Sequence, residues 1–167
     1  MSILSLLALL VLGGVIQAVV PPFSALGRAP LPVLPGLVVY YALTRTTGFL
    51  LAAAVLAGIV HDSLGLVPLG YSSLCFGVGA LWIHRFRSDV FTWDALTRMV
   101  MGFALAGGST LALSFLLRVT NQIAIPPGEM LWKAAGSGLL GGFLTPWICA
   151  AAEGLDGWLD IVERERE

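Results

Sequence analysis

The sequence predicts an all-α fold: a polytopic membrane protein in which six transmembrane helices form one bundle. Two observations support this prediction. Hydrophobic residues make up 57% of the 167 residues and charged residues only 11%, whereas a soluble domain has about 25% charged residues. Apolar runs also recur along nearly the whole chain, and roughly 20 apolar residues in a helix are enough to cross the hydrocarbon core of a bilayer. We therefore expect a single domain that is integral to a membrane.

The boundaries of the six expected spans follow from the apolar runs. Four runs are long enough to be spans by themselves, and they cover residues 3–20, 66–83, 96–117 and 131–150. The stretch from 31 to 60 is too long for one span, because it would form a helix about 45 Å long in a core about 30 Å thick. The polar segment "TRTTG" interrupts it, so we expect two short helices, 31–43 and 46–60, with Arg45 in the turn between them. Residues 1–150 would then be a six-span membrane domain.

The orientation of these spans follows from the positive charges, because cytoplasmic loops carry an excess of Lys and Arg. With six spans the cytoplasmic side holds Arg45, Arg85, Arg87, Arg98, Arg164 and Arg166, and the outer side holds Arg28, Arg118 and Lys133. A five-span alternative has a similar charge bias, but it leaves Arg45 at membrane depth at a cost of about 2.5–3.5 kcal/mol. Six spans are therefore preferred. In both arrangements the C-terminus is cytoplasmic and His61 and Asp62 lie at the outer face.

Residues 151–167 form a tail with a different character from the rest of the chain. Apolar and acidic residues alternate there at helical spacing, with Leu155, Trp158, Leu159 and Val162 on one face and Glu153, Asp156, Asp160 and Glu163 on the other. This pattern predicts a cytoplasmic amphipathic helix that continues from the last span. Its acidic face does not favour anionic lipid, which attracts Lys and Arg. It is therefore either a solvated end of the protein or a docking site for a cytoplasmic partner.

Few residues could support chemistry. Cys75 and Cys149 lie in separate apolar runs, without the spacing of a metal-binding or redox motif. His61 and His84 fall on opposite sides of the membrane in the preferred topology, so they cannot share a metal ion. No basic patch with interleaved aromatic residues suggests a nucleic acid partner. We therefore expect no catalytic residues, no metal, no cofactor and no enzymatic activity.

Small residues recur at every fourth position in two of the spans. They are Gly102, Ala106, Thr110 and Ser114 in one span and Ala134, Gly138 and Gly142 in the other. Small side chains let helix backbones approach closely, and we expect these stripes to meet inside the bundle rather than to form a dimer seam. Pro146 removes a backbone donor and predicts a kink. Trp147 either packs inside the bundle or lies at the membrane interface.

Asp62 is the polar residue that most needs an explanation. A carboxylate at the C-terminal end of a helix is unfavourable, because the helix macrodipole is negative there. Three interpretations remain open. Asp62 could begin a type I turn that ends at Gly65, with its side chain bonded to nearby backbone amides. It could instead pair with Arg28, Arg118 or Lys133, or it could contact the external domain of a partner.

In order and spacing these features resemble the rod-shape-determining protein MreD family. The resemblance rests on "LLVLGGVIQAVVPP", "RAPLPVLPGLVVYYAL" and "GFLLAAAVLAGIVHDSLGLVPLGYSSL", and "SGLLGGFLTPW" adds a Gly-then-Pro-Trp element near the end. The candidate partner-binding or structural residues at matching positions are Gln17, Arg28, Tyr40, Gly58, Asp62, Gly70, Pro146 and Trp147. The chain departs from the family pattern in its acidic tail, where several relatives are basic, and in Ala29, which separates Arg28 from Pro30.

The resemblance implies a non-catalytic component of the bacterial cell-elongation (rod-shape) complex, located in the inner membrane and supporting peptidoglycan synthesis. Its partner would be a bitopic MreC-type protein, and through it an actin-like MreB filament, a polymerising glycosyltransferase and a penicillin-binding transpeptidase. The family fold is similar to the substrate-binding subunits of energy-coupling-factor vitamin importers. Such an importer subunit is the alternative function, and it needs an outer-facing pocket with several polar groups. Only Gln17, Asp62 and the Asn121-Gln122 pair could supply them.

Overall fold

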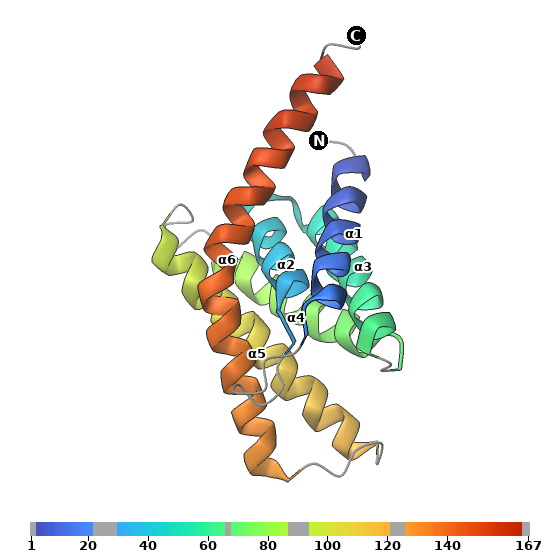
Figure 1. The fold of residues 1–167 in the computed structure, drawn as a ribbon, viewed down its shortest axis with the longest axis vertical. Helices are drawn as coiled ribbons and strands as arrows, with labels where there is room; N and C mark the ends of the chain where they lie inside the picture. Colours follow the sequence, from blue (N-terminus) through green and yellow to red (C-terminus); the bar gives the residue numbers. More distant parts are fainter. Residues whose placement is uncertain (1–2, 22–29, 66–67, 87–93, 121–125, 165–167) are drawn as a thin grey trace.

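The computed structural model describes residues 3–21, 30–65, 68–86, 94–120 and 126–164, and it confirms the all-α prediction for them. The six helices of the described residues pack into one bundle (Figure 1). In chain order they are α1 (Ile3–Val19), α2 (Val33–Thr44), α3 (Thr47–Gly65), α4 (Tyr71–Phe86), α5 (Ala95–Val119) and α6 (Pro127–Arg164).

Three of these helices are long and apolar enough to cross a membrane: α3, α5 and the Pro127–Gly157 part of α6. The helices α1, α2 and α4 have only 17, 12 and 16 residues. At 1.5 Å per residue α2 is about 18 Å long, which is well short of a hydrocarbon core about 30 Å thick. The structure therefore fits a helical membrane protein with three helices of spanning length, and the six-span arrangement stays a prediction.

The short helix α2 is the centre of the bundle. Every residue from 33 to 43 is buried, and α2 packs against all five of the other helices. A helix that is apolar on every side is stable only when it is buried in this way. Because the first turn of α2 is buried, its unpaired backbone N–H groups need partners that the protein itself supplies.

The longest helix, α6, joins the predicted last span and the predicted tail into one element. It has 38 residues, which makes it about 57 Å long, and its final turns project beyond the other helices (Figure 1). Pro146 lies inside it, and the helix continues through this residue without interruption. Proline has no N–H to donate to the carbonyl four residues earlier in the helix. Membrane helices tolerate the loss of this one hydrogen bond when neighbouring helices pack around it.

The small-residue stripes of α5 and α6 pack against each other, as the sequence predicted. A Cβ added at Gly102 would overlap the Thr145 hydroxyl, and one added at Gly107 would lie 3.3 Å from the Cα of Gly138. Polar side chains join the same interface, since Thr110 donates a hydrogen bond to Ser137 (2.8 Å). This close contact extends along most of the predicted stripe.

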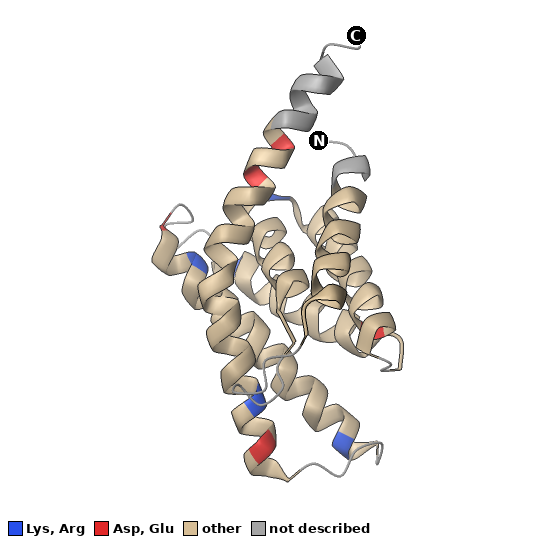
Figure 2. Ribbon diagram, in the orientation of Figure 1, with Lys and Arg blue, Asp and Glu red and all other residues tan. Residues whose placement is uncertain are grey.

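Large apolar side chains cover much of the outer surface. Val19, Leu74, Phe143 and Trp147 are all more than 60% exposed, which water would oppose and lipid favours. Figure 2 shows that the described charged residues gather toward the two ends of the bundle, with an uncharged belt between them. This distribution is typical of a protein embedded in a bilayer.

Candidate functional site

Five of the predicted site residues lie at two ends of the bundle. At the first end, here called the Asp62 end, α1 and α3 finish and α2 and α4 begin. At the second, the Asp156 end, α2 and α4 finish and α3 and α5 begin, and α6 passes alongside. Gln17, Gly58, Asp62 and Gly70 belong to the Asp62 end, and Tyr40 belongs to the Asp156 end.

Asp62 is completely buried and binds the first backbone amides of the next helix. Its Oδ2 accepts a hydrogen bond from the Gly70 N–H (2.7 Å) and its Oδ1 accepts one from the Ser72 N–H (3.2 Å). The first N–H groups of a helix have no partner within the helix, and the macrodipole makes that end positive. The carboxylate that is unfavourable at the end of α3 is therefore favourable at the start of α4.

This arrangement bears on each of the three interpretations of Asp62. The predicted turn is wrong, because α3 continues as a helix to Gly65, although the side chain does bond nearby amides as that interpretation required. None of the ion pairs within the described residues joins Asp62 to Arg118 or Lys133, and Arg28 lies outside those residues. A buried carboxylate is also not available to the external domain of a partner.

Two glycines shape the contact between α3 and α4. A Cβ added at Gly58 would overlap the backbone N and Cα of Ser73, so only glycine lets the two helices come this close. The Ser73 hydroxyl donates a hydrogen bond to the Val55 carbonyl across the same contact (3.0 Å). Gly70 has a φ of 103°, a left-handed conformation that favours glycine, and it directs its N–H toward Asp62.

Gln17 caps the start of α2 in the way that Asp62 caps the start of α4. Its buried side-chain Oε1 accepts a hydrogen bond from the Leu34 N–H in the first turn of α2 (3.3 Å). Pro32, at the N-cap of α2, provides no side-chain cap itself. In both cases a polar residue near the end of one helix caps the start of the next, so the cap also fixes how the two helices pack.

A small cavity lies beside Asp62 among the described residues. His61 Nδ1 lies 3.4 Å from the Ser72 hydroxyl and the His61 ring packs edge-on against Phe76. These residues, with Cys75 and Thr110, line a cavity of about 20 Å³, which is enough for one water molecule. Ligand pockets have volumes of about 300–1,000 Å³. Gln17 and Asp62, which the importer alternative requires for a ligand, are bonded to backbone amides instead.

At the Asp156 end, five residues form what we call the α6 clasp: Tyr40, Arg45, Arg98, Glu153 and Asp156. The Tyr40 hydroxyl and the Arg45 guanidinium both donate to Asp156 Oδ2, at 2.6 and 3.1 Å. Arg98 pairs with Glu153 at 2.7 Å. The prediction that these acids face solvent or a partner is therefore wrong for Asp156, which is buried against the body of the protein, whereas Glu153 binds Arg98 with its side chain 38% exposed. The side chains of Asp160 and Glu163 lie outside the described residues.

The histidines lie at opposite ends of the α3–α4 hairpin, as predicted. His84 lies at the Asp156 end, where its Nδ1 is 3.1 Å from the Ala42 carbonyl and its Nε2 is 3.3 Å from the Thr47 hydroxyl. No group of three or more His, Cys, Asp or Glu residues among the described ones is arranged to hold a metal ion. Trp147, on α6, is 69% exposed and therefore faces lipid rather than the bundle interior.

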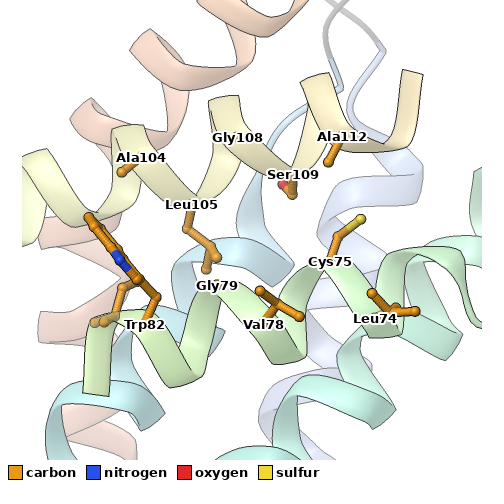
Figure 3. A pocket seen from close by; sticks show the side chains of 11 residues that line it. Leu74, Cys75, Val78, Gly79, Trp82, Ala104, Leu105, Gly108, Ser109 and Ala112 are labelled. Carbon is orange, nitrogen blue, oxygen red and sulfur yellow. The ribbon is translucent and has the colours of Figure 1, made fainter. Parts of the chain in front are cut away.

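A groove between α4 and α5 is the feature that sequence reasoning missed. It has a volume of about 300 Å³, and Figure 3 shows Trp82 at one end of it and Leu74 and Ala112 at the other. The α5 wall consists of Ala104, Gly108 and Ala112 together with Leu105 and Ser109. The signal in the sequence was a second fourfold spacing of small residues on α5.

The two neighbouring glycines of α5 show what is unusual about this groove. Gly107 faces α6, where Gly138 packs against it. Gly108 faces the groove, where no atom of the described chain lies within 4 Å of an added Cβ. The same helix thus has two faces with small residues, one packed against another helix and the other open to lipid.

The chain matches no protein-family model and no curated protein sequence, and its fold matches no solved structure. The residue pattern, the clasp, the capped helix ends and the α4–α5 groove are therefore the basis for a proposed function.

Proposed function

We propose that this chain is a non-catalytic membrane component of a bacterial cell-elongation complex, similar to the MreD family, in the inner membrane. In this proposal it binds the single membrane helix of a bitopic MreC-type partner. That partner would connect it to an MreB-type filament and to the glycosyltransferase and transpeptidase of peptidoglycan synthesis. The C-terminus and the α6 clasp would be cytoplasmic.

The bonds that the buried polar residues make support the function of a structural platform rather than that of a transporter subunit that binds a small molecule. Gln17 and Asp62 cap helices, Ser137 joins α5 to α6, and Asp156 binds Tyr40 and Arg45. In an apolar solvent each such bond fixes a helix in place, because a broken bond leaves a polar group without a partner. The positions that match the MreD pattern therefore make the bundle rigid, which is what a docking platform needs.

The observation that most directly supports the proposal is the α4–α5 groove. Helices associate in membranes through close packing rather than hydrophobicity, and small residues at fourfold spacing allow that packing. The face of α5 with Gly107 shows this geometry in use, because α6 fills it. The face with Ala104, Gly108 and Ala112 has the same spacing, and a ridge formed by Leu74, Val78 and Trp82 of α4 borders it. A single helix is the partner that fits such a surface.

Filling the groove tests this function. Gly108→Leu and Ala112→Leu place bulky side chains in the groove, where a Cβ added at Gly108 has no neighbour within 4 Å. We expect each to reduce co-purification of the MreC-type partner about tenfold or more. The measurement is partner recovered from detergent-solubilised membranes after co-expression with the full chain. Ala52→Leu is the matched control, because Ala52 is an exposed residue of α3 outside the groove.

Two results would count against the proposal. If the unmodified chain does not bind the partner at all, the proposed function is wrong. If both groove variants bind the partner as well as the unmodified chain does, the groove is not the docking surface.

A further inference from the structure

The last described turns of α6 are a poor helix by sequence. Gly154 and Gly157 lie within them, and both are exposed with open space around an added Cβ. Glycine is the weakest helix former apart from proline, and helices in proteins are held mainly by tertiary packing. These turns project past the other helices (Figure 1). Between residues 153 and 157 only Asp156 is buried, so packing apart from the acid side chains contributes little there.

The α6 clasp is what holds this segment to the body. Glu153 and Asp156 are three residues apart and therefore lie on the same face of the helix, one on each side of Gly154. Glu153 binds Arg98 at the start of α5, and Asp156 binds Arg45 and Tyr40 at the end of α2. The Asp156 side chain is 8% exposed and that of Arg98 is 13% exposed, whereas their partners Arg45 and Glu153 are 32% and 38% exposed. One member of each pair is therefore shielded from water, which strengthens the attraction.

We propose that the clasp is a latch. Residues 153–164 are helical while Glu153 and Asp156 are bound to the body, and they unwind when these bonds are broken. The latch controls access to Asp156, which is buried while the clasp is closed and becomes accessible when it opens. This inference does not depend on the proposed function, since it rests only on the clasp and on the two glycines.

Backbone amide hydrogen exchange of the full-length protein in lipid nanodiscs tests the latch. In the unmodified protein the amides of residues 154–164 should be protected. The double variant Glu153→Gln, Asp156→Asn keeps the side-chain shapes but removes both charges, and it should speed exchange of those amides about tenfold or more. The amides of α2 should stay protected and report that the bundle is intact. Glu129→Gln, at the other end of α6, is the matched control and should leave residues 154–164 unchanged.

A second pair of substitutions separates unwinding from simple displacement of an intact helix. Adding Gly154→Ala and Gly157→Ala to the double variant should restore protection, by about fivefold for each alanine. Displacement of a helix that stays folded would not respond to these alanines.

The proposal is overturned if residues 154–164 exchange freely in the unmodified protein. It is also overturned if they stay protected in the double variant, or if the alanines restore nothing. If Asp156→Asn also loosens α2, Glu153→Gln alone decides, because its carboxylate is on the more exposed side of the clasp. In that variant unchanged protection of residues 154–164 would reject the latch.

Discussion

Asp62 illustrates how this chain buries a charge inside an apolar bundle. The carboxylate lies on the last turn of α3, yet its bonds go to the first amides of α4. A buried charge is costly unless hydrogen bonds to it replace water, and here the positive end of a helix supplies those bonds. Gln17 solves the same problem for α2 with a neutral side chain.

Removing the Asp62 cap should destabilise the protein. Asp62→Ala leaves the N–H groups of buried Ser72 and exposed Gly70 without their acceptor, so we expect the free energy of unfolding in mixed micelles to fall by about 1–3 kcal/mol. Ser63→Ala is the control, because the exposed Ser63 hydroxyl bonds only the Ile59 carbonyl of its own helix. A loss no larger than that of Ser63→Ala would show that the cap contributes nothing.

At the scale of elements, α5 is a helix with two different small-residue faces. One face contacts α6 through backbone-to-backbone packing, and the other lines the groove. Added volume should therefore have opposite effects on the two faces. In a packed interface it creates a clash, whereas on an open face alanine is simply a better helix former than glycine.

Two matched glycine substitutions test this asymmetry. Gly102→Ala should lower the free energy of unfolding by about 1–3 kcal/mol, because its methyl group overlaps Thr145 and the Gly141 carbonyl. Gly108→Ala should raise it by up to about 1 kcal/mol. Both are measured on the chain without a partner. Equal effects of the same sign would contradict the assignment of the two faces.

How far the sequence predicts these elements depends on the range of the interaction. Composition and apolar runs predict the helices, and fourfold spacing predicts the α5–α6 contact, because both are local patterns. The predicted turn at Asp62 was wrong because the Asp62 side chain caps the start of α4, a different helix, and α3 continues to Gly65. The acidic face of the tail was misassigned because the partner of Asp156, Arg45, is 111 residues away in the chain. The groove was missed because its walls come from two helices.

For the molecule as a whole, the structure describes a bundle around a buried central helix that is too short to span a bilayer by itself. Charged residues lie toward both ends of the bundle (Figure 2), and many large apolar side chains are exposed on its outside. Three helices reach spanning length. The orientation with the clasp on the cytoplasmic side is part of the proposal, and it follows from the positive charges at that end. The α4–α5 groove of the described residues is where we propose that another membrane protein docks.

The most direct test of this account is site-specific photo-crosslinking in living cells. A photoreactive residue at Gly108 or Val78, which line the groove, should form a covalent adduct with the membrane helix of the MreC-type partner, identified by mass spectrometry. The same residue at the exposed Ala52 of α3 should give no such adduct. Adducts with lipid alone at Gly108 and Val78, or equal partner adducts at Ala52, would contradict the account.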